Sequence, residues 1–253
     1  MTDSLAYIDE LHQDSIDVTK KYRDIFDINL IDKNDAYKFV RKYHYLGDAR
    51  FFNEYSFGLF YKGNIVGVSS FAQPQGYYTT KGWFGNFFCG KEYEVMELQR
   101  LAMLPILNGT NATSYLLSNS MKKLKPYGIK VVITLADSCR HVGSIYQVCN
   151  FRYFGLTDKK TDFYVEKTGK KVGHGKTKGI RGVYIPRNRK HRYAFLLDKR
   201  VPIKYQEEPY PKKKDLLLSS KSGIYKDTRL GCDTYYKYDR ESDTIHLIGD
   251  SLH

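Results

Sequence analysis

Two apolar runs of strand length stand out in the hydrophobic pattern, and a polar turn and a helical stretch separate them. The first run, residues 94–104, ends at a proline, which has no N–H to give to a sheet. The second run, residues 129–136, ends at an aspartate. Between them, residues 108–114 favour turns and helix caps, and residues 115–124 form a helical stretch. The pattern predicts strand, turn, helix and strand, with parallel strands and a right-handed crossover.

The segments before this unit predict a hairpin covered by helices. Residues 1–28 mix acidic and apolar residues, and we interpret them as an amphipathic helix that covers one face of a sheet. Residues 35–47 predict a helix that follows an aspartate cap. Residues 55–61 and 65–71 predict a β-hairpin with Gly-Asn at its tip. Residues 73–91 are rich in glycine and aromatic residues and predict a loop. Its aromatic side chains line a substrate cleft, stack on an exposed base or pack on the core.

The segments after the unit complete the predicted fold class, which is α/β (α+β) with a mixed central sheet and helices on both faces. We divide the chain into a domain of residues 1–200, with a basic loop at 167–192, and a C-terminal extension of residues 201–253. The later elements are a helix at 143–151, strands at 152–156, 162–165 and 191–197, a loop at 167–189, and a tail hairpin of 234–238 with 243–248.

Polar side chains interrupt the first apolar run. Strict alternation places Glu97 and Gln99 on one face of the strand and Arg100 on the other. A central strand is covered on both faces, so burial of these side chains without partners would be costly. We therefore expect them to line a polar cleft near the carboxyl ends of the parallel strands, where Asp137 also lies. The alternative is a structural salt bridge of Arg100 with Glu97 or Glu94.

The net positive charge is confined to one segment. The chain carries a formal net charge of +13, and residues 167–214 alone hold sixteen Lys and Arg against three Asp and Glu. A basic segment of this kind predicts a polyanionic partner. The alternative is a solvated basic loop that only aids solubility. The residues of the densest cluster, which we expect to bind nucleic acid, are Arg181, Arg187, Arg189, Lys190 and Arg192.

Other classes of protein lack support in the sequence. No run of eighteen apolar residues is present, and the N-terminus lacks the regions of a signal peptide, so we expect no membrane contact. The four cysteines are scattered without a CxxC pair and indicate reduced thiols in the cytoplasm. No Walker A, GxGxxG, HExxH or GxSxG motif occurs. The 23 tyrosines suit stacking on bases, and equally the edges of a sheet.

The end of the first run and the turn read Leu101-x-Met103-x-Pro105-x-x-Asn108-x-x-Asn111-x-Thr113. This frame resembles the cofactor-binding core of the GNAT-type acyltransferases, in which Arg or Gln and two glycines stand where this chain has asparagine and threonine. The resemblance implies a site for acetyl-coenzyme A, or a related thioester, with the turn N–H groups on the pyrophosphate. The implied cofactor-binding residues are Leu101, Met103, Asn108, Gly109, Thr110, Asn111, Ala112, Thr113 and Ser114.

A series of short motifs narrows the resemblance. In chain order these are Glu97-Leu-Gln-Arg100, Ser114-Tyr-Leu-Leu, Ala136-Asp137, Gly143 to Phe151, and His191-Arg-Tyr193. The series spans residues 35–213 and is similar to the phage Mom-type DNA-modification proteins, to which acylation of adenine in DNA is ascribed. The resemblance therefore implies a DNA partner as well as a thioester.

The resemblance also implies catalytic roles. Tyr146 stands where GNAT-type enzymes keep the tyrosine that protonates the leaving thiolate, and its alternative is core packing. Asp137, Glu97 or His44 takes a proton from the acceptor amine, and Arg100 lies with them in the cleft. For His44 the alternative is a surface histidine at a helix C-terminus. A metal ion held by His44 and Asp137 is a further hypothesis, which one histidine and one carboxylate do not establish.

These inferences predict an acyltransferase-like enzyme that transfers an acyl-derived group from acetyl-coenzyme A to a base amine in DNA, at adenine N6. A Mom-type role implies an anti-restriction protein of a phage, acting in the host cytoplasm. One alternative is a basic nucleic-acid-binding protein without catalysis, which leaves the polar residues of the central strand unexplained. Another is a GNAT enzyme that acts on tRNA, a protein or a small amine.

Overall fold

The structure is a computed structural model, and it divides the chain into two compact units. The first unit comprises Met1–Thr134, Ile145–Arg152 and Ala194–Gln206, and the second comprises Leu135–Ser144, Tyr153–Tyr193 and Glu207–His253. The residues described are 16, 21–47, 51–75, 77–138, 141–158, 160–165, 171–172, 177–187, 189–212, 216–219, 224–227, 235–239 and 244–249.

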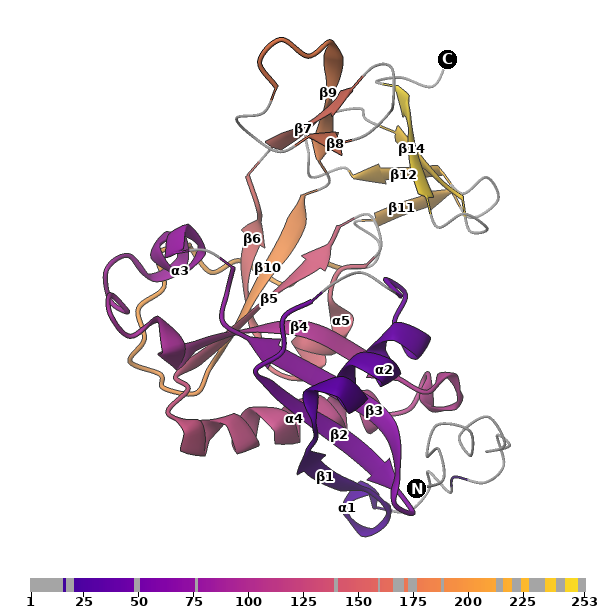
Figure 1. Cartoon of the computed structure of the whole chain (residues 1–253), viewed down its shortest axis with the longest axis vertical. Coiled ribbons are helices and arrows are strands. Elements are labelled where there is room, and N and C mark those ends of the chain that lie inside the picture. The colour runs from indigo at the N-terminus through magenta and orange to yellow at the C-terminus, as the bar shows by residue number, and fades with distance from the viewer. Residues whose placement is uncertain are drawn as a thin grey trace. The chain divides into compact units, whose positions relative to one another are not determined.

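A mixed seven-stranded sheet runs in the order β1-β2-β3-β4-β5-β10-β6 (Figure 1). The pairs β1–β2, β2–β3 and β3–β4 are antiparallel, whereas the pair β4–β5 is parallel. The parallel pair flanks the predicted turn and helix, and the mixed sheet confirms the predicted fold class. The strands are β1 (Asp27–Leu30), β2 (Tyr55–Tyr61), β3 (Asn64–Ala72), β4 (Val95–Met103), β5 (Val131–Asp137), β6 (Arg152–Leu156) and β10 (Lys190–Leu196).

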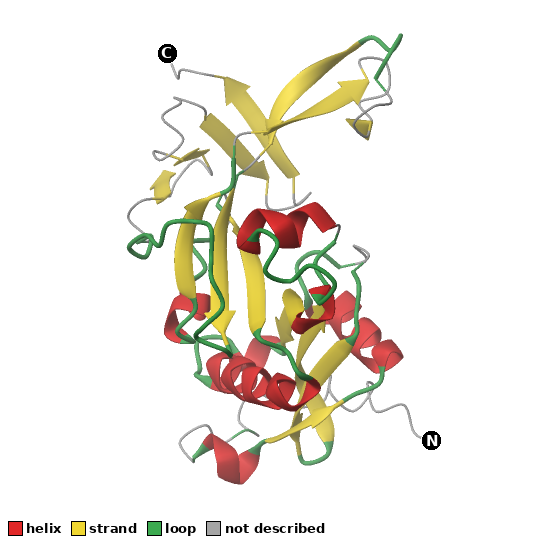
Figure 2. Cartoon of the chain, turned by 90° about the vertical axis from the view of Figure 1, so that its left-hand side faces the viewer, coloured by secondary structure: helices red, strands yellow, loops and turns green. Residues whose placement is uncertain are grey.

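Helices α2 (Lys33–Tyr43) and α4 (Ala112–Leu124) cover opposite faces of the antiparallel part of the sheet (Figure 2). Ser69 in β3 shares a hydrogen bond with Ser120 in α4, with 2.8 Å between their side-chain oxygens. Side chains alternate along a strand, so Ser70 points to the other face, where α2 packs on β2, β3 and β4. The other helical segments are α1 (Tyr22–Ile25), α3 (Tyr77–Phe84), η3 (Glu92–Glu94), η4 (Pro105–Leu107), η5 (Lys125–Tyr127) and α5 (Ser144–Val148).

Local sequence explains the start of α2 and the turn of the hairpin. The Asp32 side chain caps α2 by accepting a hydrogen bond of 2.7 Å from the Asn34 N–H. The β2–β3 hairpin forms as predicted, but Lys62 and Gly63 make its turn and Asn64 opens β3. Both turn residues have positive φ, at 47° and 81°, as the favoured two-residue hairpin turn requires.

Two predictions for the N-terminal half are wrong. Asp27–Leu30 forms the edge strand β1 by pairing with residues of β2, whereas the end of a helix was predicted there. Residues 73–91 are not a continuous loop, because they contain α3, where Trp83 and Phe84 are buried. Most of the N-terminal helix predicted for residues 1–28 lies outside the described residues. In the described part of the chain, no helix is long and apolar enough to cross a membrane.

The second unit holds two smaller antiparallel sheets. Strand β9 pairs along all of β7, from Lys160 with Arg187 to Val165 with Gly182, so the prediction of a continuous loop at 167–189 is wrong. A Cβ at Gly182 would lie 2.2 Å from a β7 carbonyl oxygen, so this pairing requires glycine. A four-stranded sheet contains the predicted tail hairpin as β13 and β14. The strands are β7 (Lys160–Val165), β8 (Lys171–Val172), β9 (Gly182–Arg187), β11 (Leu216–Ser219), β12 (Ile224–Asp227), β13 (Tyr235–Asp239) and β14 (Thr244–Gly249).

Candidate active site

The pairing between the parallel strands β4 and β5 is short. Within the described residues of the first unit, the backbone register covers Val95–Glu97 with Val131–Ile133. At the next position the Thr134 hydroxyl donates to the Leu98 carbonyl oxygen at 3.4 Å. Strand β4 continues to Met103. A polar side chain therefore stands where the ladder of the parallel pair ends, and we call this position the strand gap.

A β-bulge lies in β4 beside the strand gap. Ser70 pairs with Arg100 and Phe71 pairs with Leu98, so Gln99 is an extra residue in β4. A bulge takes its extra residue out of the ladder and changes the direction of the side chains that follow. The strict alternation predicted for this strand is therefore wrong beyond Leu98.

The bulge brings Glu97 and Arg100 to the same face of the sheet, although alternation predicts opposite faces. Glu97 pairs with Ala72, two residues beyond the partner of Arg100 in β3, so both side chains point to the α2 face. The Arg100 guanidinium lies over the ring of Phe51, 5.2 Å from its centroid. Burial lowers the pKa of Arg100, whereas Tyr45 and Glu97 raise it. Arg100 is thus a half-buried cation with a carboxylate and a phenol nearby.

Tyr146 in α5 is buried at the strand gap. Only 9% of the residue is exposed, and its hydroxyl shares a hydrogen bond with the Thr134 side chain. Burial raises the pKa of Tyr146 above the ordinary value of 10, and the bond to Thr134 offsets part of this rise. The phenol therefore stays protonated at neutral pH and can act as a proton donor.

Tyr45 is 52% exposed and lies within electrostatic range of the strand gap. It follows α2 in the chain, and it interacts electrostatically with both Arg100 and Tyr146. Tyr146 approaches from the α4 side, because Cys149, in the turn that directly follows α5, contacts the Ser114 carbonyl oxygen of α4 at 3.8 Å. The two tyrosines therefore interact electrostatically at the strand gap. We define the gap cluster as Tyr45, Glu97, Arg100, Thr134 and Tyr146.

His44 lies next to the gap cluster as the C-cap of α2. Its Nδ1 accepts a hydrogen bond of 3.1 Å from the Leu46 N–H, and its ring stacks on Tyr45 with 4.3 Å between centroids. Because Nδ1 accepts, Nε2 carries the proton of the neutral imidazole. His44 is half-buried.

The predicted turn forms the N-terminus of α4, which begins earlier than predicted, at Ala112. The Asn111 N–H donates to the Tyr22 hydroxyl at 3.1 Å, and the Ala112 N–H donates to the Thr110 hydroxyl at 3.2 Å. The helix supplies no acceptor for the N–H groups of its first turn. The N–H groups of the next two residues have no acceptor within the described chain, so the turn keeps donors for an anion.

The remaining residues implied for the cofactor lie on the approach to this turn. Leu101 and Met103 stay in register with β3 beyond the bulge, and Met103 is buried. Asn108 ends η4, and Gly109 has a φ of 80°, which favours glycine. The structure therefore places the implied cofactor residues on one continuous segment that leads from the bulge to α4.

Asp137 is the last residue of β5 and belongs to the second unit, whereas His44 belongs to the first. Its role as a base and the metal site shared with His44 therefore stay predictions. Among the residues that the structure describes, no group of three or more His, Cys, Asp and Glu could hold a metal ion.

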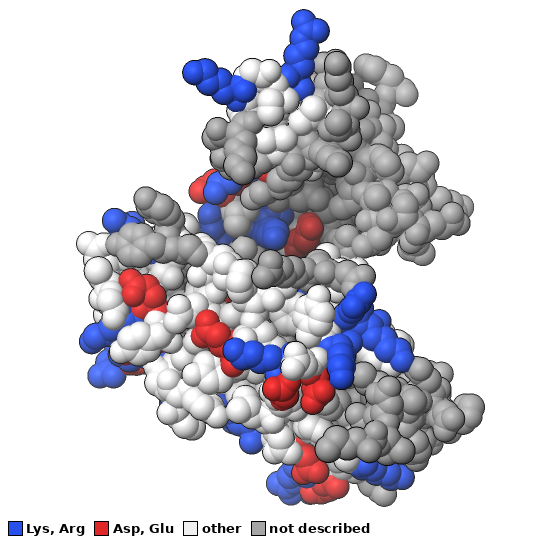
Figure 3. Space-filling model, viewed as in Figure 1, with Lys and Arg blue, Asp and Glu red and all other residues white. Residues whose placement is uncertain are grey.

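The five residues predicted to bind nucleic acid differ in their surroundings. Arg192 is only 7% exposed, and it pairs with a carboxylate at 3.3 Å. Arg189 donates to two backbone carbonyl oxygens. Arg181 and Lys190 are exposed, and Arg187 ends β9. Figure 3 shows Lys and Arg side chains projecting from the region of β7 and β9.

Three residues near these sites fall outside the sequence prediction. Tyr45 follows His44, and its position after a helix gives only a weak signal. Thr134 stands within an apolar, β-branched run, where threonine is an ordinary strand residue. Tyr22 lies in a segment interpreted as a covering helix. Their proximity to the strand gap and to the turn depends on long-range packing.

The comparison with known families adds a second kind of observation. Residues 25–212 match the Mom protein family. The chain belongs to this family. The range that matches the Mom family contains the whole gap cluster and the turn before α4. No curated protein matches the chain.

Solved structures similar to this Mom-family chain include several acetyltransferases. An IAA acetyltransferase from Bacillus cereus ATCC 14579 is 14% identical, with 68% of this chain and 99% of that chain covered and a TM-score of 0.38. An acetyltransferase from Bacillus subtilis in complex with CoA is 15% identical, with 68% and 99% covered and a TM-score of 0.42. A GNAT family acetyltransferase from Elizabethkingia anophelis with acetyl-CoA bound is 15% identical, with 69% and 99% covered and a TM-score of 0.43. TM-scores of this size support no conclusion about activity.

Proposed function

We propose that this Mom-family protein transfers an acyl-derived group from acetyl-coenzyme A, or a related thioester, to the N6 amine of adenine in DNA. The gap cluster is the observation that carries the proposal. It combines a buried phenol that keeps its proton, a half-buried cation and a carboxylate at the end of a parallel strand pair. Burial of polar side chains at the end of a strand pair lowers the stability of a protein. A role in a reaction would explain why this chain has them there.

The N-terminus of α4 supports a site for the pyrophosphate of coenzyme A. Its first turn keeps backbone N–H donors, and the helix dipole favours negative charge there. The Tyr22 hydroxyl accepts the Asn111 N–H and still has its own proton to donate to a phosphate oxygen. The residues that would hold the cofactor are thus the turn itself, Tyr22 and the β4 segment before it.

The chemistry follows from the protons that the chain can hold. A bound acyl-coenzyme A would supply a thioester that is activated for attack by an amine. Tyr146 holds a proton at its phenolic oxygen and can give it to the sulfur that leaves. Arg100 and Glu97 carry opposite charges near the other face, where they can orient a polar acceptor. The adenine amine is neutral at pH 7, so a base takes the proton released as the new N–C bond forms, and Glu97, His44 and Asp137 are the candidates.

Two observations support DNA as the acceptor. The residues that match the Mom family include the gap cluster. Acylation of adenine in DNA is the reaction ascribed to Mom-type proteins, and the resemblance implies the same reaction here. The net charge is confined to residues 167–214, as a phosphate-binding segment requires. Within that segment, Arg181 and Lys190 are exposed and open to phosphate.

The test is modification of DNA by the purified protein. The protein is incubated with acetyl-coenzyme A and duplex or single-stranded DNA, and the digested nucleosides are analysed by mass spectrometry. We expect a mass increase on deoxyadenosine. In Tyr146→Phe, turnover should fall roughly 100-fold or more, because a proton donor is lost while little volume changes. The affinity for coenzyme A, measured by calorimetry, should stay within a factor of about two, because the turn is intact.

Tyr127→Phe is the matched control, since Tyr127 is 46% exposed in η5 and the same atom is removed. It should keep full turnover. Absence of coenzyme A binding at millimolar concentration, together with unmodified nucleosides, would contradict the proposal and favour a protein that only binds nucleic acid. Modification of tRNA or protein in place of DNA would keep the acyltransferase and replace its acceptor.

A further inference from the structure

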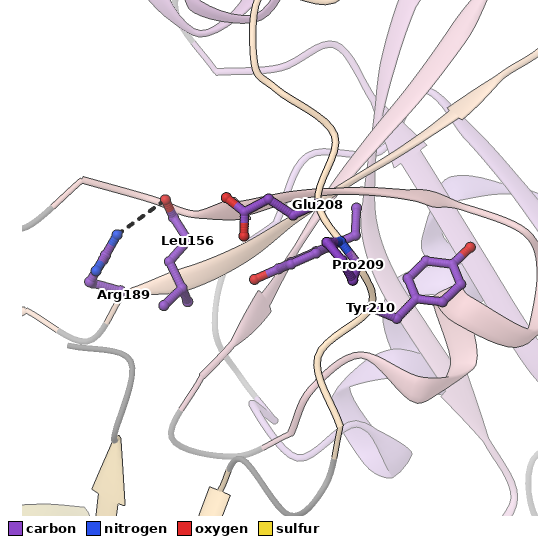
Figure 4. A pocket seen from close by; sticks show the side chains of 6 residues that line it. Leu156, Arg189, Glu208, Pro209 and Tyr210 are labelled. Carbon is purple, nitrogen blue, oxygen red and sulfur yellow. Dashed lines mark hydrogen bonds between the residues drawn. The ribbon is translucent and has the colours of Figure 1, made fainter. Parts of the chain in front are cut away.

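The second unit contains a pocket that is separate from the gap cluster and has a cavity volume of about 430 Å³ (Figure 4). Tyr153 and Leu156 of β6 line it, together with the residue before β10 and a segment that follows β10. Arg189 and Tyr210 lie toward opposite ends, with Glu208 between them. The lining residues are Tyr153, Leu156, Arg189, Glu208, Pro209 and Tyr210.

The two charged residues of the pocket keep hydrogen-bonding capacity. Arg189 uses its Nε and one Nη2 hydrogen on the carbonyl oxygens of Thr157 and Leu156, so the rest of its five N–H groups remain for a ligand. The Glu208 carboxylate makes no ion pair or hydrogen bond with the described residues, and Arg189 has no acidic partner among them. A guanidinium and a carboxylate therefore line one cavity without neutralising each other.

The Glu208 carboxylate lies close to the backbone of β6 at Gly155. A Cβ at Gly155 would lie 2.2 Å from Glu208 Oε1. The carboxylate therefore occupies the space that a side chain at position 155 would need. Gly155 also has a φ of 72°, which favours glycine. The Glu208 N–H donates to the Tyr153 carbonyl oxygen at 2.9 Å. The Glu208 backbone is thus anchored to β6, and its carboxylate lies over one wall of the pocket.

We propose that this pocket binds a guanine base. Guanine is the standard base with two adjacent donors, N1–H and the N2 amine, on one edge and two adjacent acceptors, O6 and N7, on the next. A carboxylate matches the two donors and a guanidinium matches the two acceptors. On adenine and cytosine a ring nitrogen acceptor lies beside the amine and would face the carboxylate. Tyr210 and Pro209 supply flat apolar surface for the face of the ring.

The exposed basic residues of the same unit favour a nucleic-acid strand over a free nucleotide as the source of the guanine. Lys190 directly follows Arg189 and is exposed, and Arg181 is exposed as well. The N1–H and N2 groups are engaged in a base pair within duplex DNA, so the strand has to present the guanine unpaired. This source rests on the proposed function, in which the protein binds DNA.

The test measures binding of the full chain to fluorescein-labelled oligothymidine with one central guanine, by fluorescence anisotropy. The same strand is made with hypoxanthine, which lacks the N2 amine, and with 7-deazaguanine, which lacks the N7 acceptor. The wild-type protein should bind each analogue roughly tenfold more weakly than guanine. The Glu208→Gln variant should bind guanine and hypoxanthine equally. An amide has one acceptor oxygen and a donor NH2 group, so it cannot accept from both N1–H and the N2 amine.

Glu207→Gln is the matched control, with the same charge change one residue outside the pocket, and it should keep the preference for guanine. Equal binding of guanine and hypoxanthine by the wild type would overturn the assignment. Guanosine monophosphate is tested as a competitor in the same assay. Strong binding of the free nucleotide, lost in Glu208→Gln, with no strand binding would keep the guanine pocket and contradict DNA as the acceptor in the proposed function.

Discussion

Two cysteines with different surroundings give a prediction at the scale of single residues. Cys149 is buried in the turn that follows α5, and burial raises the pKa of its thiol, partly offset by a hydrogen bond from Ser118. Cys89 is exposed. Because the thiolate is the nucleophile, iodoacetamide at pH 8 should modify Cys149 more than about tenfold slower than Cys89. Peptide mass spectrometry over a time course measures both rates in one sample.

Unfolding provides the control for this comparison. Guanidinium chloride at about 6 M unfolds typical domains. At this concentration the modification rates of Cys149 and Cys89 should converge, because both thiols are then exposed to solvent. Equal rates in the native protein would contradict the burial of Cys149 and, with it, the packing of α5 against α4.

At this scale the sequence selected residues that the structure brings together, but it did not predict their geometry. Tyr146 could be selected because its spacing to Phe151 is part of a motif. The shared face of Glu97 and Arg100 could not be predicted, since it depends on a bulge that only the register of β3 creates. The alternative salt bridge of Glu94 with Arg100 is wrong, because Glu94 pairs with Lys130 at 2.8 Å.

At the scale of elements, α4 matters both for the turn and for the core. Leu116 of α4 is fully buried and lies beside Gly67 of β3. Leu116→Ala should lower the free energy of unfolding by about 2–5 kcal/mol, through lost burial and the cavity that remains. Urea denaturation followed by circular dichroism measures this change.

Lys122→Ala is the control in the same helix, because Lys122 is exposed. Its free energy of unfolding should change by less than about 0.5 kcal/mol. A loss for Leu116→Ala no larger than that of the control would show that α4 does not pack on β3 as described.

Strands and helices with strong hydrophobic patterns could be predicted from the sequence. Strands and helices that form mainly through contacts with neighbouring elements could not. Strands β4 and β5 and helix α4 have long apolar runs between clear stop signals. Strand β1 has four residues with only Ile28 buried, so its pairing with β2 defines it more than its pattern does. Helix α3 contains two threonines and a glycine, which disfavour helices, yet Trp83 and Phe84 bury two large rings there.

At the scale of the whole molecule, the asymmetry of charge gives a prediction about affinity. Reversing Lys178, Arg181 and Lys190 to Glu should weaken binding of duplex DNA irrespective of its sequence. Each phosphate contact that is lost should flatten the dependence of log affinity on log salt by about 0.9, because fewer counterions are released. Fluorescence anisotropy between 50 mM and 200 mM salt, a range over which such affinities change strongly, measures the slope.

The control reverses three exposed lysines of the first unit, Lys33, Lys38 and Lys122, which gives the same change in net charge. Its slope should stay close to that of the wild type. Equal losses in the two variants would show that net charge alone attracts DNA, and the basic segment would then be a solvated loop. Coenzyme A affinity should survive in both variants, since none of these residues lies in the turn before α4.

The chain passes between the two units five times, after residues 134, 144, 152, 193 and 206. Strands β5, β6 and β10 each begin in one unit and end in the other. The gene therefore contains no contiguous stretch that encodes either unit. A recombination event that exchanges the stretch between residues 134 and 207 would replace parts of both units at once. Replacement of either unit as a whole would need several separate crossovers, so the two units do not behave as modules that recombination can shuffle.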